Sequence, residues 1–134
     1  MIMQTGNVRK KIFRGLEAED LKKLSIEEFA SKIKSGERRS LLRSTREIDD
    51  FVKKAEKKIM KNKIPKTHTR EMVIVPKFLD WTIGVHNGKD YTQVKVTIEM
   101  LGHRLGEFAP TRRIVKHGAA GVGSTKGTSS LSVK

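Results

Sequence analysis

The sequence predicts an α+β fold, with helices in its first half and a small three-stranded sheet in its second half. Three observations support this prediction. Apolar residues repeat at helical spacing before residue 62, apolar residues alternate at strand spacing after residue 72, and an Asn87-Gly88 pair separates two alternating runs. We expect a helical N-terminal extension over residues 1–62, an α+β core over 63–113 and a flexible basic tail over 114–134.

The composition favours a polyanionic partner. The 134 residues include 29 Lys and Arg against 15 Asp and Glu, which gives a net charge of +14. Such a charge points to nucleic acid more often than to a membrane or an acidic protein. The chain has no cysteine, which excludes disulfides and thiolate metal ligands. Without a signal-peptide pattern or a membrane-spanning run, we expect a cytoplasmic protein with no membrane partner.

Two short helices are predicted first. The spacing of the leucines predicts one amphipathic helix, from Leu16, Leu21 and Leu24. Ser25 and Glu28 then form a capping-box pattern, in which each side chain bonds the other residue's backbone amide. We expect the helix that follows to end at Gly36.

A longer helix is predicted after a basic linker at residues 37–43. Ser44 and Glu47 repeat the capping-box pattern, and apolar residues then recur at helical spacing to about Lys61. We interpret Lys53 and Lys54 as a solvated helix face.

A basic run follows, and Pro65 prevents a helix from continuing through it. Cations are weakly favoured at a helix C-terminus, which explains one or two lysines but not five in ten residues. Phosphate binding explains this run better; it comprises Lys57, Lys58, Lys61, Lys63 and Lys66.

The strands are predicted from alternation. Residues 72–76 read as one strand, and Leu79 to Val85 and Val94 to Ile98 alternate as two more. We expect a hairpin at His86–Lys89, because Asn-Gly tolerates positive φ at both central positions of a tight turn. The strand at 72–76 would add the third strand.

The end of the chain combines a short helix and a tail. Thr97 is positioned to cap a helix over 98–108, and Gly102 and Gly106 indicate a close backbone approach, to the sheet or to an RNA backbone. The tail is rich in Gly and Ser and has no aromatic residue, so we expect it to be disordered in isolation.

Catalytic and metal patterns are weak. The tail lacks the Lys-Ser/Thr of a phosphate loop, and the four histidines show no metal-binding spacing. His103 and Glu107 could act as a nuclease pair, but a polar RNA-facing segment explains them better. Asp80, Asp90, Glu99 and Glu107 could form a glycosidase pair, but a chain of charge +14 with one Trp and one Tyr is a poor sugar-binding surface. No basic recognition helix for DNA and no aromatic stacking platform for single strands is evident. We therefore expect no enzyme, no cofactor and no metal.

One stretch carries a family resemblance. The pattern TIGVHNG at 82–88, VKVT at 94–97 and EMLGHRLGEFAPTR at 99–112 closely resembles the S19 family of small-subunit ribosomal proteins. FRG at 13–15 and ERRSLLR at 37–43 resemble its archaeal and eukaryotic branch. The tail departs from that branch, with Ala120 in place of a Pro and Ser124 in place of an Ala.

The resemblance implies a structural constituent of the small ribosomal subunit. It implies a place in the head, binding to the 3′ domain of the rRNA, a neighbour of the S13 family, and a tail that reaches toward tRNA and the decoding region. A stand-alone RNA- or DNA-binding regulator is the alternative, and a small basic nuclease comes third.

The predicted RNA contacts are basic or polar residues of loops, hairpin and tail. They are Lys57, Lys58, Lys61, Lys63, Lys66, His68, Thr69, Arg70, Lys77, His86, Asn87, Lys89, His103, Arg104, Arg112, Arg113, Lys116, His117 and Lys126.

Overall fold

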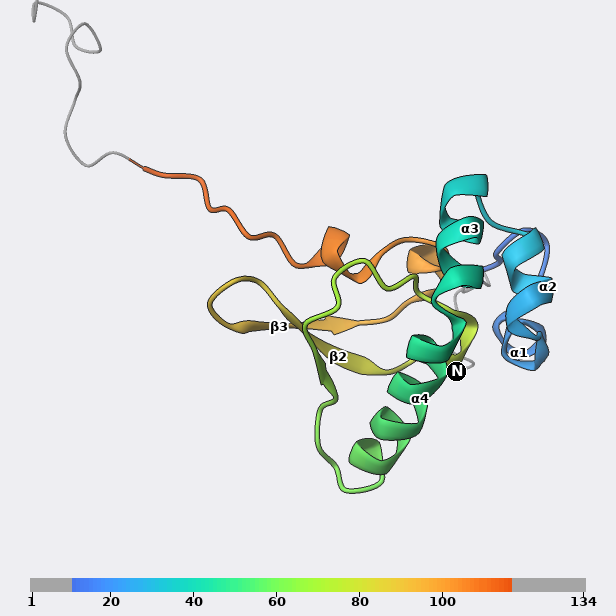
Figure 1. The fold of residues 1–134 in the computed structure, drawn as a ribbon, viewed down its shortest axis with the longest axis horizontal. Helices are drawn as coiled ribbons and strands as arrows, with labels where there is room; N and C mark the ends of the chain where they lie inside the picture. The colour runs from blue at the N-terminus through green and yellow to red at the C-terminus, as the bar shows by residue number, and fades with distance from the viewer. Residues whose placement is uncertain (1–10, 117–134) are drawn as a thin grey trace, which may run out of the picture.

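The computed structural model describes residues 11–116, and within them four α-helices precede a three-stranded sheet (Figure 1). This arrangement confirms the predicted α+β class. The helices are α1 (Ala18–Lys23), α2 (Ile26–Ser31), α3 (Ser35–Arg43) and α4 (Thr45–Ile59). The strands are β1 (Lys66–Thr67), β2 (Thr82–His86) and β3 (Tyr91–Lys95), and the 3-10 turns are η1 (Pro76–Phe78), η2 (Ile98–Met100) and η3 (Leu105–Phe108).

The sheet has the order β1-β2-β3 and is mixed. β2 and β3 form the predicted antiparallel hairpin, in register from Thr82 opposite Lys95 to His86 opposite Tyr91. β1 pairs with β2 in parallel, with Lys66 opposite Gly84. The third strand is therefore Lys66–Thr67, not the segment at 72–76.

The prediction of a sheet strand at 72–76 was wrong because this segment crosses the core. The side chains from Met72 to Val75 are all buried, so neither side of the segment faces solvent. Its backbone pairs with the chain near residue 103: the Ile74 amide donates to the His103 carbonyl at 2.8 Å, and the Leu105 amide donates to the Met72 carbonyl at 3.0 Å. A partner outside the sheet thus satisfies its polar groups.

The predicted basic linker at 37–43 is helical. It forms most of α3, and Gly36 lies in the first turn of that helix instead of ending the one before it, since α2 ends at Ser31. α3 buries only Leu41. A helix with one buried position has almost no apolar periodicity, which is the signal that the prediction used.

One of the two predicted capping boxes is present. The Glu28 amide donates to Ser25 Oγ at 3.2 Å, and the Ser25 amide donates to Glu28 Oε2 at 2.9 Å. The Ser44 box was wrong, because the Ser44 hydroxyl donates to the Ser40 carbonyl at 2.8 Å. α3 runs almost directly into α4 there, so Ser44 closes one helix with its side chain and does not cap the next.

The hairpin loop spans residues 87–90. Asn87 Oδ1 accepts from the amides of Lys89 at 3.1 Å and Asp90 at 2.8 Å. In this loop only Gly88 has a positive φ, of 102°. Asn87 thus acts as a side-chain acceptor, and the expected two-residue turn with two left-handed positions is not formed.

The predicted helix over 98–108 is two separate 3-10 turns. Gly102 lies between them with a φ of 76°, and Thr97 makes no capping bond with its side chain. A Cβ on Gly102 would lie 3.0 Å from Ile33 Cγ2, and one on Gly106 would lie 3.0 Å from the Arg70 carbonyl oxygen. Both glycines do meet close neighbours, but the partners are Ile33 and Arg70, which lie outside the sheet that the prediction named.

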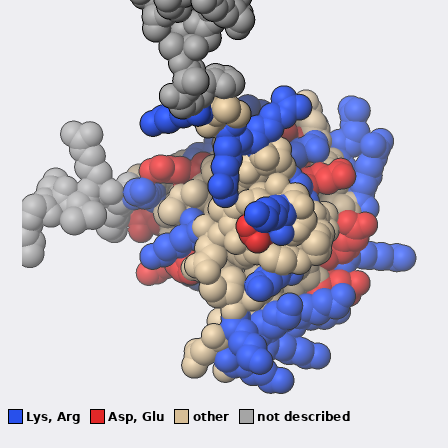
Figure 2. Space-filling model, turned by 90° about the vertical axis from the view of Figure 1, so that its left-hand side faces the viewer, with Lys and Arg blue, Asp and Glu red and all other residues tan. Residues whose placement is uncertain are grey.

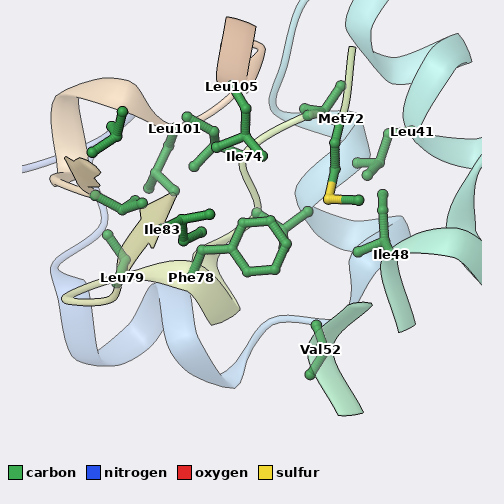
Figure 3. Close-up of a cluster of buried hydrophobic side chains, with 14 of the residues drawn as sticks. Leu41, Ile48, Val52, Met72, Ile74, Phe78, Leu79, Ile83, Leu101 and Leu105 are labelled. Atoms are coloured by element: carbon green, nitrogen blue, oxygen red, sulfur yellow. The ribbon is translucent and has the colours of Figure 1, made fainter. Parts of the chain in front are cut away.

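One hydrophobic core joins the helices to the sheet (Figure 3). The side chains of Leu41, Ile48 and Val52 from α3 and α4 belong to the same buried cluster as Ile74 and Ile83. The helical extension and the α+β core are therefore packed as one unit.

Candidate nucleic-acid interface

The predicted basic run lies at the end of α4 and in the loop after it. The left-handed Asn62 (φ 54°) ends the helix, and the Lys63 amide donates to the Lys58 carbonyl at 2.9 Å. This is a Schellman-type helix end, for which Gly or Asn is preferred. It turns the chain sharply at Asn62, before Pro65 is reached.

No acidic side chain in the described part of the chain pairs with the charges of this run. Its five lysines are exposed, and none forms an ion pair with another residue in the range 11–116. Residues 57–70 contain no Asp or Glu. Figure 2 shows the result at the lower end of the molecule, where Lys and Arg side chains crowd together without acidic ones between them. We call Lys57, Lys58, Lys61, Lys63 and Lys66 the lysine edge.

Arg70 has a different environment from the lysine edge. Its guanidinium donates to the carbonyls of His86 at 2.6 Å, Gly106 at 2.9 Å and Ala109 at 2.6 Å. These bonds tie the hairpin to η3, and Arg70 is half-buried between them. The structure therefore gives Arg70 a scaffolding role. Its predicted RNA contact stays untested, and we leave it out of the interface proposed below.

Lys77 lies in η1, and its ammonium is 3.8 Å from Asp49 of α4. Both side chains are more than two-fifths exposed, so this pair contributes little to stability. Lys77 remains accessible, but the nearby carboxylate of Asp49 partly offsets its charge.

The hairpin end holds several predicted contacts. Lys89 is exposed at the loop, whereas the Asn87 side chain is occupied by backbone amides and by Thr92 Oγ1 at 3.3 Å. The Gly88 amide donates to His86 Nδ1 at 3.2 Å. Among these residues, Lys89 is the one positioned to meet a phosphate. Thr69 is also exposed, and its amide donates to Thr67 Oγ1 at 3.1 Å.

Three rings gather beside the hairpin: His86 and Tyr91 pair across it, and His68 comes from a distant part of the chain. The ring centroids of His68 and His86 are 4.4 Å apart, and those of His86 and Tyr91 are 5.1 Å apart. The Tyr91 hydroxyl lies 2.6 Å from His68 Nε2. The rings form a cluster, while the expectation that aromatic stacking platforms for single strands are missing stays a prediction. The prediction also missed Tyr91, because only the fold brings residue 91 to residue 68.

The His103–Glu107 pair is formed. His103 Nδ1 lies 2.8 Å from Glu107 Oε2, and the Arg104 amide donates to Glu107 Oε1 at 3.3 Å. Glu107 thus bonds groups at the start of its own turn. Arg104 is half-buried, and its backbone bridges to Val73.

The segment after η3 leaves the body of the molecule. Arg112, Arg113 and Lys116 are exposed in an extended stretch that Figure 1 shows in orange. The predicted contacts His117 and Lys126 lie outside the described residues, as does the tail beyond them.

The family of the chain follows from a match to a family model. The family model described as Ribosomal protein S19 matches residues 36–117. The matched region begins in α3 and includes α4, the sheet and both turns after it. The chain belongs to the ribosomal protein S19 family.

Membership in the S19 family fixes the class of function. The chain is a structural, non-enzymatic component of the small ribosomal subunit in the cytoplasm, and it binds rRNA. The nuclease interpretation of His103 and Glu107 is thereby removed. Exposed cations are the groups that proteins use to contact phosphates, and the lysine edge is an exposed group of this kind.

Residues 11–116 offer neither a metal site nor a membrane-spanning helix. Residues 11–116 hold no cluster of three or more His, Cys, Asp or Glu side chains that could bind a metal ion. The helices within that range include none with the length and apolarity that a bilayer crossing requires.

Proposed function

We propose that this S19-family protein binds the 3′ domain of small-subunit rRNA in the head of the subunit. Its folded body acts as a rigid frame that holds exposed cations at fixed places, which is how positioning contacts to phosphates work. The observation that carries the proposal is the lysine edge, whose five exposed lysines lie in a stretch, residues 57–70, that contains no Asp or Glu. Lys89 and the exposed Arg112, Arg113 and Lys116 extend this basic surface.

The domain of the rRNA is tested by comparing two transcripts. The full chain is titrated against the 3′ domain and against the 5′ domain of small-subunit rRNA at the same salt concentration. We expect tighter binding to the 3′ domain, since nonspecific phosphate attraction alone would be equal for both. Equal affinities would contradict the proposed place in the head.

The stand-alone regulator is tested by co-sedimentation. We expect the protein to stay with small subunits after a high-salt wash that removes loosely held basic proteins, because shape-specific contacts in an assembled subunit depend less on salt than phosphate attraction does. Release into the supernatant would favour the regulator.

We further propose an S13-family neighbour and a tail that reaches tRNA. Both rest on the family resemblance, and residues 117–134 lie outside the described part of the chain. Short-range crosslinking within assembled subunits tests the neighbour, and an S13-family protein missing from the crosslinked products would contradict it. Crosslinking from tRNA bound to those subunits tests the tail, with Lys126 as the expected point of attachment and its absence as the contrary result.

We also propose that the chain is of the archaeal and eukaryotic type of the family, on the strength of FRG at 13–15 and ERRSLLR at 37–43. Residues 13–16 form a small closed turn in which Phe13 and Leu16 exchange backbone hydrogen bonds at 3.0 and 2.9 Å. Phe13 then packs on Phe29 of α2 with ring centroids 6.0 Å apart. This segment is therefore part of the folded body.

A further inference from the structure

One face of the sheet is open to solvent. Side chains alternate between the two faces of a strand, and residues opposite each other across a pair share a face. Ile83, Val85 and Val94 are buried and point into the core. The other face carries the alternate residues of β2 and β3 and the β1 residue opposite Gly84: Thr82, Gly84, His86, Tyr91, Gln93, Lys95 and Lys66.

This open face has the groups that a nucleotide needs. A hollow of about 460 Å³ lies on it, lined in part by Tyr91, Gln93 and Lys89. Its volume falls in the range of roughly 300–1,000 Å³ that is usual for small-molecule sites. The Lys66 ammonium lies 4.9 Å from the Tyr91 ring centroid, so a cation already occupies the face of this ring.

The Tyr91 ring is held in place by two histidines. Its hydroxyl is bonded to His68 Nε2 at 2.6 Å, and the rings of His68 and His86 meet it nearly edge-on, at interplanar angles of 77° and 69°. These contacts restrain the ring before any ligand arrives, which lowers the entropy cost of binding.

Gly84 lines the hollow, and its lack of a side chain leaves space beside the Tyr91 ring. A Cβ at this position would lie 3.2 Å from Lys66 Cγ and 3.6 Å from Tyr91 Cβ. A side chain there would push Lys66 outward and fill the space beside the ring.

We propose that this open face binds one unpaired nucleotide of the rRNA, with its base stacked on Tyr91. The proposal rests on the proposed function, because it names a further contact to the same RNA. Every base has a π-face, so stacking accepts any base, while the Gln93 amide can donate to and accept from a base edge. The base takes the place of the Lys66 ammonium, which together with Lys89 meets the flanking phosphates.

Asp90 also lines the hollow and argues for a base over a bare phosphate. A carboxylate repels a phosphate group, but it accepts hydrogen bonds from the amino groups of bases. Recognition of unpaired bases by stacking and edge contacts is the usual route to single-stranded RNA.

The test compares Tyr91→Leu with Tyr91→Phe in the full chain, bound to the 3′ domain of small-subunit rRNA. Tyr91→Phe keeps the ring, so it should bind within about twofold of the wild type. Tyr91→Leu should bind roughly tenfold more weakly, with an unchanged dependence on salt because no phosphate contact is lost. Equal binding of the wild type and Tyr91→Leu would overturn the stacking site alone, whereas a wild type that does not bind this RNA would overturn the proposed function too.

A second measurement does not depend on how a variant folds. Ultraviolet crosslinking of the wild-type protein to a short single-stranded oligoadenylate should attach the RNA to the peptide that contains Tyr91. The same strand paired in a duplex should lose that crosslink, since its bases are no longer available. Attachment only at other peptides would overturn the proposal.

Discussion

Arg70 shows how a basic residue within an RNA-binding stretch can serve the protein itself. Its donors reach carbonyls 16, 36 and 39 residues further along the chain. In the sequence, THTR at 67–70 follows the five lysines, and the pattern alone predicts that every cation of this stretch binds phosphate. The distinction depends on which carbonyls the fold brings to residue 70, and no local pattern contains that information.

The first prediction concerns Arg70→Lys. Lysine keeps the charge but lacks the planar fork, so most of the three carbonyls lose their donor. We expect a loss of roughly 2–3 kcal/mol in the free energy of unfolding, measured by urea titration. Arg113→Lys, at an exposed position, is the matched control and should change little. Equal stability of the two variants would refute the scaffolding role.

The second prediction concerns Glu28. The Ser25 backbone amide, and then the Ser25 hydroxyl, lower the pKa of Glu28 below its ordinary value of 4.5. A lowered pKa in the folded state adds stability above the unfolded pKa, and this stability disappears as the pH falls through the folded pKa. Glu28→Gln should therefore be less stable than wild type at neutral pH, and the gap should close in acid. Glu27→Gln, in the same helical turn, controls for the general effect of an N-terminal carboxylate. A gap that persists in acid, or one equal to that of Glu27→Gln, would contradict the capping role.

At the scale of elements, α4 and the Schellman-type turn at its end determine where the lysines of the lysine edge lie. The sequence predicted α4, and with it the place of the lysines at its end, because fifteen helical residues give a strong apolar stripe. The prediction was wrong for α3 and for the third strand. β1 has only two residues, and two residues have no readable period. The segment at 72–76, by contrast, has strand-like composition but is enclosed on both sides.

The third prediction compares two lysine pairs of α4. Lys57→Gln with Lys58→Gln should reduce the slope of log affinity against log salt by about 1–2 units, since about 0.7–0.9 is lost per phosphate contact. Lys53→Gln with Lys54→Gln removes the same charge from the same helix. We expect the second pair to leave the slope unchanged. The account would be wrong about the lysine edge if both pairs reduced the slope equally.

At the scale of the whole molecule, the helices and the sheet share one core. Leu41 and Ile48 are fully buried in the same cluster as Ile74 and Ile83. The sequence suggested an extension before residue 63 and a core after it, because the period of the pattern changes there. Side chains from both sides of residue 63 pack in the same core. The periodicity of a sequence does not show which face of a helix packs on which face of a sheet.

The fourth prediction follows from this shared core. A fragment of residues 63–116 should show no cooperative thermal unfolding, because its buried cluster would face water where α3 and α4 now lie. A fragment of residues 11–116 should keep the transition of the full chain. Calorimetry measures both, and a cooperative transition in the shorter fragment would show that the helices are dispensable.

The central claim is that a rigid frame presents uncompensated cations to small-subunit rRNA. The most direct measurement is the association constant of the full chain for this RNA across a range of salt concentrations. The account predicts a linear fall of log affinity with log salt, with a slope of about −3 or steeper, because the lysine edge alone offers enough phosphate contacts for that value. A flat dependence would contradict the claim.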